Sequence, residues 1–221
     1  MTDALYKILI AGDAWLTILN GLLVTVQISA LSLLFGTMLG ATVCFLRLSD
    51  NKIFSTSARI FISIVRGSPV LMLLMLLFYG VFAGSGLSPM LVAIITFSLH
   101  TAAHVAELIR AAFSAIDHGQ VEAARTLGFS KIQAFKLVTM PQIIRIAKPV
   151  YQSTVVNLIQ WTSVVGYVTI TDLTRVINTT ASRTMQPMLT ITIGMLIYLS
   201  ISYVVYGLFA LSDRRGEHEH N

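Results

Sequence analysis

Residues 15–46, WLTILNGLLVTVQISALSLLFGTMLGATVCFL, form an apolar run without a single charged side chain. A helix crosses the hydrocarbon core of a bilayer with about 20 consecutive apolar residues. This run is longer than one crossing requires, so we expect it to tilt or to extend into the interface. Gly36 and Gly40 within it follow a GxxxG spacing, which allows another helix to pack closely. The stretch therefore predicts a membrane-spanning helix.

The composition of the whole chain agrees with a protein that has lipid as its solvent. Of the 221 residues, 55% are hydrophobic and 11% are charged, whereas a soluble domain carries about 25% charged residues. Disorder is excluded because so much apolar surface is available for burial. A disulfide scaffold is excluded because Cys44 is the one cysteine. We expect an integral membrane protein.

Four more segments have the length and the apolar character of a span: residues 53–82, 89–113, 149–171 and 187–211. Residues 114–148 are too charged to lie in lipid. The sequence therefore predicts an all-α integral membrane protein with five transmembrane helices, a single domain over residues 1–221, and one sizeable loop between the third and fourth helices.

The basic residues indicate how the chain is oriented, because cytoplasmic loops collect Lys and Arg. The first loop contains Arg47, Lys52 and Arg59, the second loop (residues 81–88) contains no charge, and residues 114–148 are rich in basic side chains. We expect the N-terminus outside, and the large loop and the C-terminus in the cytoplasm. The net charge of +5 lies between spans, so we expect membrane lipid and no nucleic acid as a partner.

The loop over residues 119–140 shows helical spacing of apolar residues on both sides of Gly128. Gly128 has the backbone freedom to end one short helix and begin another, and Pro141 should stop or redirect the second. Ala123 and Ala124 after Glu122 are small enough for another surface to approach closely. Such a loop is suited to docking into a partner; the alternative is an amphipathic helix on the inner leaflet.

These residues carry a resemblance to a known family. Glu122-Ala123-Ala124, Gly128 and residues 138–141 (VTMP) resemble the EAA loop of ATP-binding-cassette (ABC) importer permeases. That pattern is EAA, three residues, Gly, nine residues and Ile-x-Leu-Pro, and this chain has Val138 and Met140 at the Ile and Leu positions. The likeness extends to the polar amino acid uptake branch of histidine, glutamine and arginine type, through residues 21–27 (GLLVTVQ), 66–69 (RGSP), 106–110 (AELIR) and 181–184 (ASRT).

The resemblance implies the type I ABC importer permease architecture in a bacterial inner membrane. In that family two permease chains form the pathway, a dimer of cytoplasmic ATP-binding subunits supplies energy, and an extracytoplasmic solute-binding protein delivers the solute. The EAA loop fits the ATPase, which assigns coupling to Glu122, Ala123, Ala124, Gly128 and Pro141. This chain lacks the nucleotide-binding pattern G-x-x-x-x-G-K-[ST], so we expect hydrolysis in a partner, and no catalytic residue, cofactor or metal here.

Polar residues in the fourth segment are candidates for the solute pathway, since lipid cannot satisfy them. They are Asn157, Gln160, Trp161, Thr162 and Ser163; the alternative is hydrogen bonding between helices at a subunit interface. The amino acid branch often has Lys-Asp-Thr-Ser where this chain has Gln160-Trp161-Thr162-Ser163. The lost charges favour pairing with a different permease chain over a homodimer, or a less charged solute.

The third segment places His100, His104 and Glu107 one turn apart. Two histidines at this spacing could contact the solute, bind a metal or relay protons, but structural hydrogen bonding is the simpler interpretation. Together with Glu107 they offer an alternative function, an ion-coupled secondary transporter or channel. Against it are the EAA loop and the lack of inverted repeats. Glu107 and Arg110 should instead form an ion pair at the interface.

Overall fold

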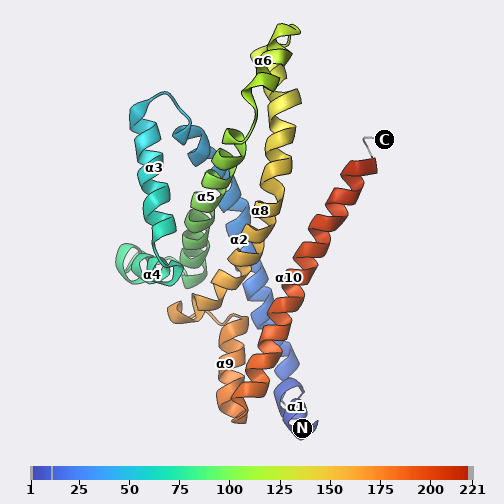
Figure 1. Cartoon of the computed structure of the whole chain (residues 1–221). Helices are drawn as coiled ribbons and strands as arrows, with labels where there is room; N and C mark the ends of the chain where they lie inside the picture. Colours follow the sequence, from blue (N-terminus) through green and yellow to red (C-terminus); the bar gives the residue numbers. More distant parts are fainter. Residues whose placement is uncertain (1, 11, 219–221) are drawn as a thin grey trace. The chain divides into compact units, whose positions relative to one another are not determined.

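The computed structural model describes residues 2–10 and 12–218, and each regular element within those ranges is a helix (Figure 1). The α-helices and the shorter π and 3₁₀ turns, marked η, follow in this order: α1 (Thr2–Leu9), α2 (Ala14–Arg47), α3 (Lys52–Gly67), α4 (Val70–Leu76), η1 (Leu77–Val81), α5 (Pro89–Ser114), α6 (His118–Thr126), α7 (Lys131–Ala134), η2 (Phe135–Thr139), α8 (Met140–Trp161), η3 (Thr162–Val168), α9 (Leu173–Thr184) and α10 (Pro187–His218). The predicted all-α class is confirmed.

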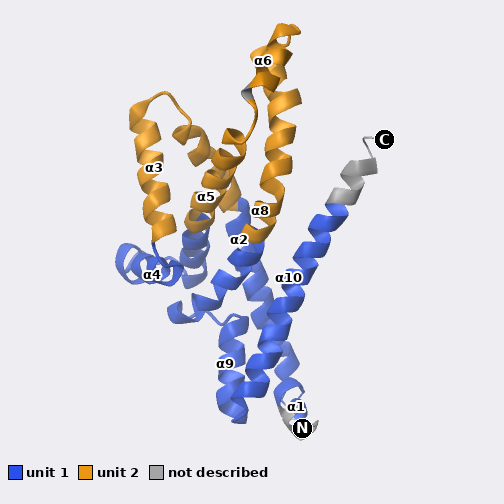
Figure 2. Ribbon diagram, viewed as in Figure 1, with its two compact units in different colours: residues 1–34, 68–98, 155–221 blue, residues 35–67, 99–154 orange. Residues whose placement is uncertain are grey.

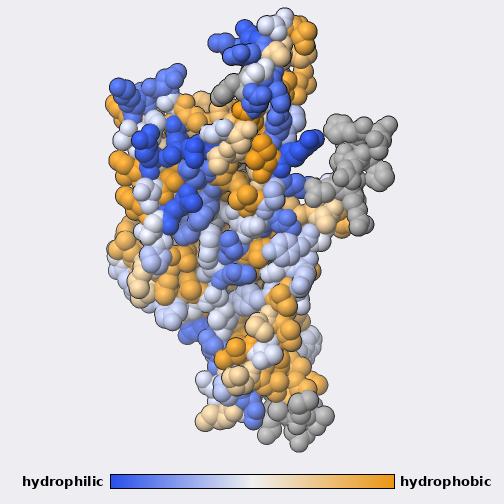
Figure 3. Space-filling model, viewed as in Figure 1, coloured by the Kyte–Doolittle hydropathy of each residue, from blue (hydrophilic) through white to orange (hydrophobic). Residues whose placement is uncertain are grey.

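Three of the described helices are long and apolar enough to cross a membrane: α2, α5 and residues 187–212 of α10. They correspond to the first, third and fifth predicted spans. The apolar windows of α2 and α10 are mostly unburied, and large hydrophobic side chains of α10 such as Leu196, Tyr203 and Leu208 are exposed. Figure 3 shows hydrophobic residues over much of the face in view, as expected where lipid or another membrane chain is the neighbour.

The second predicted span, over residues 53–82, consists of two helices separated by a short break. Its two halves, Lys52–Gly67 and Val70–Val81, are bent by 107° at the break between them. Pro69 has no amide hydrogen to donate and disfavours the helical conformation at Ser68, so α3 ends at Gly67. Together the halves form a broken span or a re-entrant segment.

The fourth predicted span, residues 149–171, does not coincide with a single helix. α8 begins at Met140, inside the predicted loop, and ends at Trp161, and residues 162–168 form a 3₁₀ helix. Pro141 does not stop the helix, because it occupies the first turn of α8, where a missing amide hydrogen costs little. The π turn η2 directly precedes it, where a regular helix would clash with the proline ring. The five-span count stays a prediction.

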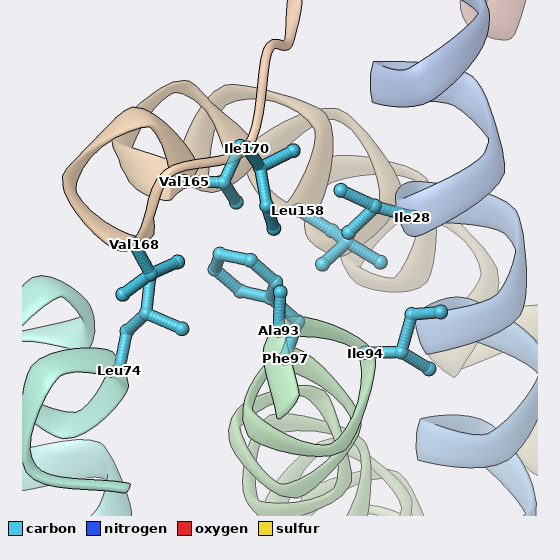
Figure 4. Close-up of a cluster of buried hydrophobic side chains, with 9 residues drawn as sticks. All are labelled: Ile28, Leu74, Ala93, Ile94, Phe97, Leu158, Val165, Val168 and Ile170. Atoms are coloured by element: carbon cyan, nitrogen blue, oxygen red, sulfur yellow. The ribbon is translucent and has the colours of Figure 1, made fainter. Parts of the chain in front are cut away.

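The chain forms two compact units, coloured in Figure 2: residues 1–34, 68–98 and 155–221 in unit 1, and residues 35–67 and 99–154 in unit 2. In unit 1, Phe97 of α5 is fully buried among apolar side chains from other helices (Figure 4). The cluster comprises Ile28, Leu74, Ala93, Ile94, Phe97, Leu158, Val165, Val168 and Ile170. A second cluster joins Ile18 of α2 to Leu173, Val176 and Ile177 of α9. These contacts fix η3 and α9 in place.

In unit 2 the core joins α2, α3 and α5 through Val43, Cys44, Ala58, Ile62 and Ala106. A further cluster of Ala112, Ile116 and Ile143 connects α5 to α8. Gly40 permits this packing, since a Cβ there would lie 2.7 Å from Val105 Cβ and 2.8 Å from the Ala102 carbonyl oxygen. The close contact expected from the GxxxG spacing is therefore present at Gly40.

Candidate functional site

The α6–α7 hairpin, residues 118–134, contains the predicted docking residues and has a well-defined turn. Gly128 has φ +91°, a conformation that glycine adopts without penalty. Its amide donates to the Arg125 carbonyl at 3.1 Å, and the Phe129 amide donates to the Ala124 carbonyl at 3.2 Å. This pair of bonds is the Schellman arrangement that closes a helix C-terminus. A helix on each side of Gly128 is confirmed, but the second one does not end within the loop, since α7, η2 and α8 follow one another from Lys131 to Trp161.

The second helix of the hairpin begins with a capping box at Ser130. The Ser130 Oγ accepts from the Gln133 amide at 3.2 Å, and the Gln133 Oε1 accepts from the Ser130 amide at 2.8 Å. Gln142 Nε2 donates to Gln120 Oε1 at 2.7 Å, which connects the start of α8 to α6. Since the turn and both flanks are hydrogen-bonded, the hairpin presents one fixed surface.

The exposed surface of the hairpin includes large apolar side chains, which are unfavourable in contact with water. Leu127 is 80% exposed and Ile132 is 68% exposed, and Phe135, Leu137 and Met140 are exposed beside them. Charged side chains stand among them, and Figure 3 shows hydrophilic residues around α6. Of the predicted coupling residues, Glu122, Ala123, Gly128 and Pro141 are exposed, whereas Ala124 is buried. Exposed apolar side chains together with charged ones are typical of a protein-binding surface.

The predicted pathway residues of the fourth segment do not share one environment. Asn157 and Gln160 are exposed on α8. Trp161 packs against the Phe97 cluster, and Thr162 is fully buried and donates through Oγ1 to the Ile159 carbonyl at 2.7 Å. Ser163 is half-buried in η3. Of these five residues, only Asn157 and Gln160 are exposed.

The histidine pair and Glu107 lie in unit 2 and do not act as one cluster. The rings of His100 and His104 stack with centroids 4.9 Å apart and planes at 15°. Glu107 Oε1 accepts from Arg110 Nε at 2.9 Å and from Nη2 at 2.6 Å, and its Oε2 lies 3.6 Å from Arg47 Nη2. The expected ion pair is confirmed. Within the described residues, no group of three or more His, Cys, Asp or Glu side chains could hold a metal ion.

Sequence reasoning missed a hollow of about 210 Å³ in unit 1, formed by η3 and α9. It is lined by Ser163, Gly166, Tyr167, Thr174, Arg175 and Asn178. The signal that could have found it is Arg175 itself, because a basic residue is uncommon in a loop predicted to lie outside.

Asp172 positions the helix that forms one wall of this hollow. It is fully buried and caps α9, accepting from the Arg175 and Thr174 amides at 3.0 Å each. The Thr25 hydroxyl accepts from the Leu173 amide at 3.2 Å, which ties the same turn to α2. Burial raises the pKa of the Asp172 carboxyl, although the two amide bonds lower it.

Residues 32–217 match the family described as binding-protein-dependent transport system inner membrane component. The chain belongs to this family. Its fold class and its recognition as an ABC importer permease are thereby confirmed, and nothing in the comparisons favours an ion-coupled transporter.

Relatives of this permease family include transporters with named solutes. The chain is 33% identical to the nopaline transport system permease protein NocM of Agrobacterium fabrum, over 86% of this chain and 83% of the relative. It is 29% identical to the histidine/lysine/arginine/ornithine transport system permease protein HisM of Salmonella typhimurium, over 89% and 88% of the two chains.

Solved structures show the same fold. A crystal structure of an amino acid ABC transporter with histidines matches with a TM-score of 0.81 and 28% identity, covering 90% of this chain and 94% of that one. An inward-facing structure of the MetNI methionine ABC transporter matches with a TM-score of 0.78 and 18% identity, covering 93% and 99%; it supports the fold alone.

Proposed function

We propose that this chain is the membrane-spanning permease subunit of an ATP-driven importer for a polar amino acid. The permease role follows from the family, and the amino acid class is supported by the solutes named for HisM and for NocM. The sequence has no glycine followed by lysine, so it lacks the phosphate-binding pattern of an ATPase. ATP hydrolysis is assigned to a separate subunit.

The observation that carries the coupling mechanism is the exposed, hydrogen-bonded surface of the α6–α7 hairpin. Glu122, Ala123 and Gly128 lie on it, and Leu127 offers an apolar side chain to a partner. Ala124 acts from inside by closing the turn through its carbonyl. A rigid hairpin transmits the closure of an ATPase to α8, because Gln120 and Gln142 bond the two elements to each other.

The proposed assembly has a dimer of cytoplasmic ATP-binding subunits, a second permease chain and an extracytoplasmic solute-binding protein. A different second chain is favoured over a copy of this one, since Gln160 and Trp161 stand where the amino acid branch often has a charged pair. We place the N-terminus outside and the C-terminus in the cytoplasm of a bacterium, with five spans in one permease domain.

Along the pathway, Asn157 and Gln160 are the residues proposed to face the solute, since both are exposed on α8. Ser163 extends this set into η3. Thr162 is buried and bonded within its own turn, and Trp161 packs in the core, so they support the pathway wall. His100 and His104, whose rings stack on α5, stay candidates for contact with the solute.

A matched pair of substitutions tests the docking surface. Leu127 in the hairpin and Met188 in α10 are each 80% exposed, so Leu127→Ser and Met188→Ser remove equally exposed apolar side chains. Burying a leucine contributes about 1.5–3 kcal/mol, so Leu127→Ser should weaken ATPase binding at least about tenfold. The tagged chain is purified from its bacterial host, its partners are identified by mass spectrometry, and ATP-driven uptake is measured in vesicles.

We expect Leu127→Ser to lose the copurified ATPase and the uptake of L-histidine, L-lysine, L-arginine or L-glutamine, and Met188→Ser to retain both. Equal losses in the two variants would contradict docking at the hairpin. Transport by this chain alone under a proton gradient, without ATP, would contradict the importer itself. Recovery of a complex with two identical permease chains would contradict only the preference for a heterodimer.

A further inference from the structure

The hollow between η3 and α9 contains a guanidinium held in a fixed position. Arg175 Nη1 donates to the Gly166 carbonyl at 3.0 Å, and a Cβ built on Gly166 would lie 3.6 Å from Arg175 Cβ. The stem of Arg175 thus lies against Gly166, and its head is tied to the same residue. Thr169, with φ +68°, turns the chain just after η3 and donates to the same carbonyl at 3.3 Å. The position of the charge is therefore set before any ligand arrives.

No acidic side chain neutralises this charge in the part of the chain that the structure describes, where the ion pairs join Glu107 to Arg47 and to Arg110. Asp172 lies three residues before Arg175, but it is fully buried and both of its carboxylate oxygens accept backbone amides. A guanidinium has five N–H donors, and one of them is used on Gly166. The others remain for an anion.

The rest of the lining suits one end of a small ligand. Ser163 and Asn178 add neutral polar groups, and the Thr174 hydroxyl is already paired with Tyr198 at 2.8 Å. No carboxylate lines the hollow, so it has no charged partner for an ammonium group. Its volume of about 210 Å³ is below the ~300–1,000 Å³ typical of pockets that enclose a whole ligand. The lining selects a carboxylate, because a planar guanidinium binds it through two parallel hydrogen bonds.

We propose that this hollow binds the α-carboxylate of the transported amino acid, with Arg175 as the charged contact and Ser163 and Asn178 beside it. The inference rests on the proposed function, since it needs the solute to be an amino acid. It assigns recognition of the group common to all amino acids to η3 and α9. Discrimination between side chains then belongs to other residues, because the hollow is too small for them.

The test is equilibrium binding of radiolabelled L-histidine, L-lysine, L-arginine and L-glutamine to the purified permease assembly in lipid nanodiscs, without binding protein. The matching amino acid amides, which lack the carboxylate charge, serve as competitors. Arg175→Met and Asn178→Asp are the test variants. Arg183→Met removes an exposed charge from the same helix outside the hollow, and Asn178→Ala controls for loss of the amide.

We expect Arg175→Met to raise the Kd of the bound amino acid about 10- to 100-fold, because charge-assisted hydrogen bonds contribute on that scale. Asn178→Asp should have a similar effect by pairing with Arg175. Arg183→Met should bind like the wild type, and the amides should compete at least about tenfold more weakly. Asn178 is exposed, so Asn178→Asp keeps the test valid if Arg175→Met fails to assemble.

Equal Kd values in Arg175→Met and Arg183→Met, or equal competition by the amides, would overturn the inference. So would an unchanged amino acid Kd together with weaker docking of the solute-binding protein in Arg175→Met, since the hollow would then receive an acidic side chain of that protein. If the wild-type assembly binds none of the four amino acids, the carboxylate site is overturned. The uptake measurement above then decides separately whether the chain serves an amino acid importer.

Discussion

Gly128 offers the sharpest test of how the α6–α7 hairpin is built. Its φ of +91° lies in a region that L-residues rarely adopt, and a Cβ built there would meet nothing within 4 Å. Any free-energy cost of Gly128→Ala therefore comes from the backbone conformation and not from a clash of the new Cβ with neighbouring atoms. A left-handed backbone costs an L-residue about 1–2 kcal/mol. Since 1.4 kcal/mol is a factor of ten, the closed turn should lose roughly 5- to 30-fold in population.

Hydrogen exchange measures that population directly. The Phe129 amide is held by the Ala124 carbonyl and the Gly128 amide by the Arg125 carbonyl, so both exchange when the turn opens. In the intact assembly, we expect exchange at Phe129 to be about 5- to 30-fold faster in Gly128→Ala, and ATP-driven uptake to fall with it. Gly128→Asn should lie between Ala and wild type, because asparagine tolerates positive φ better.

The matched control is Gly207→Ala in α10, where a Cβ also meets nothing within 4 Å and the backbone has no positive φ. It should leave both exchange at Phe129 and uptake unchanged. The reasoning is refuted if Gly128→Ala exchanges like the wild type, or if Gly128→Asn is more damaging than Gly128→Ala. Either result would mean that the turn does not depend on the glycine conformation.

Two further predictions concern stability. Gly40→Ala should lower the thermal stability of the purified chain, since overpacking against Val105 costs about 1–3 kcal/mol and exceeds the ~1 kcal/mol gained in helix propensity. The control Gly207→Ala should be neutral or stabilising. A Tm for Gly40→Ala at or above that of the wild type would contradict the prediction. Asp172 has a pKa raised from 3.8, so the folded state binds its proton more tightly and stability is lost as pH rises from 3.8 through the raised value. Asp172→Asn keeps the cap, so the Tm of the wild type relative to this variant should rise on acidification, and a Tm difference that does not change with pH would contradict this.

The parts of the structure that could be predicted from sequence are those decided by local chemistry. A long uncharged run has to cross lipid, and α2 does match residues 15–46 closely. The hairpin was predictable for the same reason. Gly128 ends one helix because glycine can adopt a positive φ without help from other residues. Ser130 and Gln133 then begin the next helix through their side chains. Neither feature needs a distant part of the chain to define it.

Features that depend on how segments meet were not predictable in the same way. Mean hydropathy over residues 53–82 is a sum over residues and does not depend on the direction of the helix axis. It therefore could not predict the 107° bend between the two helices. Pro141 was predicted to stop or redirect the second helix of the loop, and the sequence did not indicate that a π turn would precede it. The five candidate pathway residues from Asn157 to Ser163 looked alike in sequence, and only packing around Phe97 separates Trp161 from the exposed Gln160.

The fates of three arginines show why composition alone assigns no role to a charge. Arg47 and Arg110 both form ion pairs with Glu107, so their charges are paired within unit 2. Arg175 has a carboxylate three residues away, yet the two cannot pair, because Asp172 is buried under its own helix cap. Because Asp172 caps the N-terminus of α9, its carboxylate does not compete with an external anion for Arg175. The guanidinium that remains in the hollow is available to an external anion because of that cap, which makes Asp172 a positioning residue for the site that Arg175 forms.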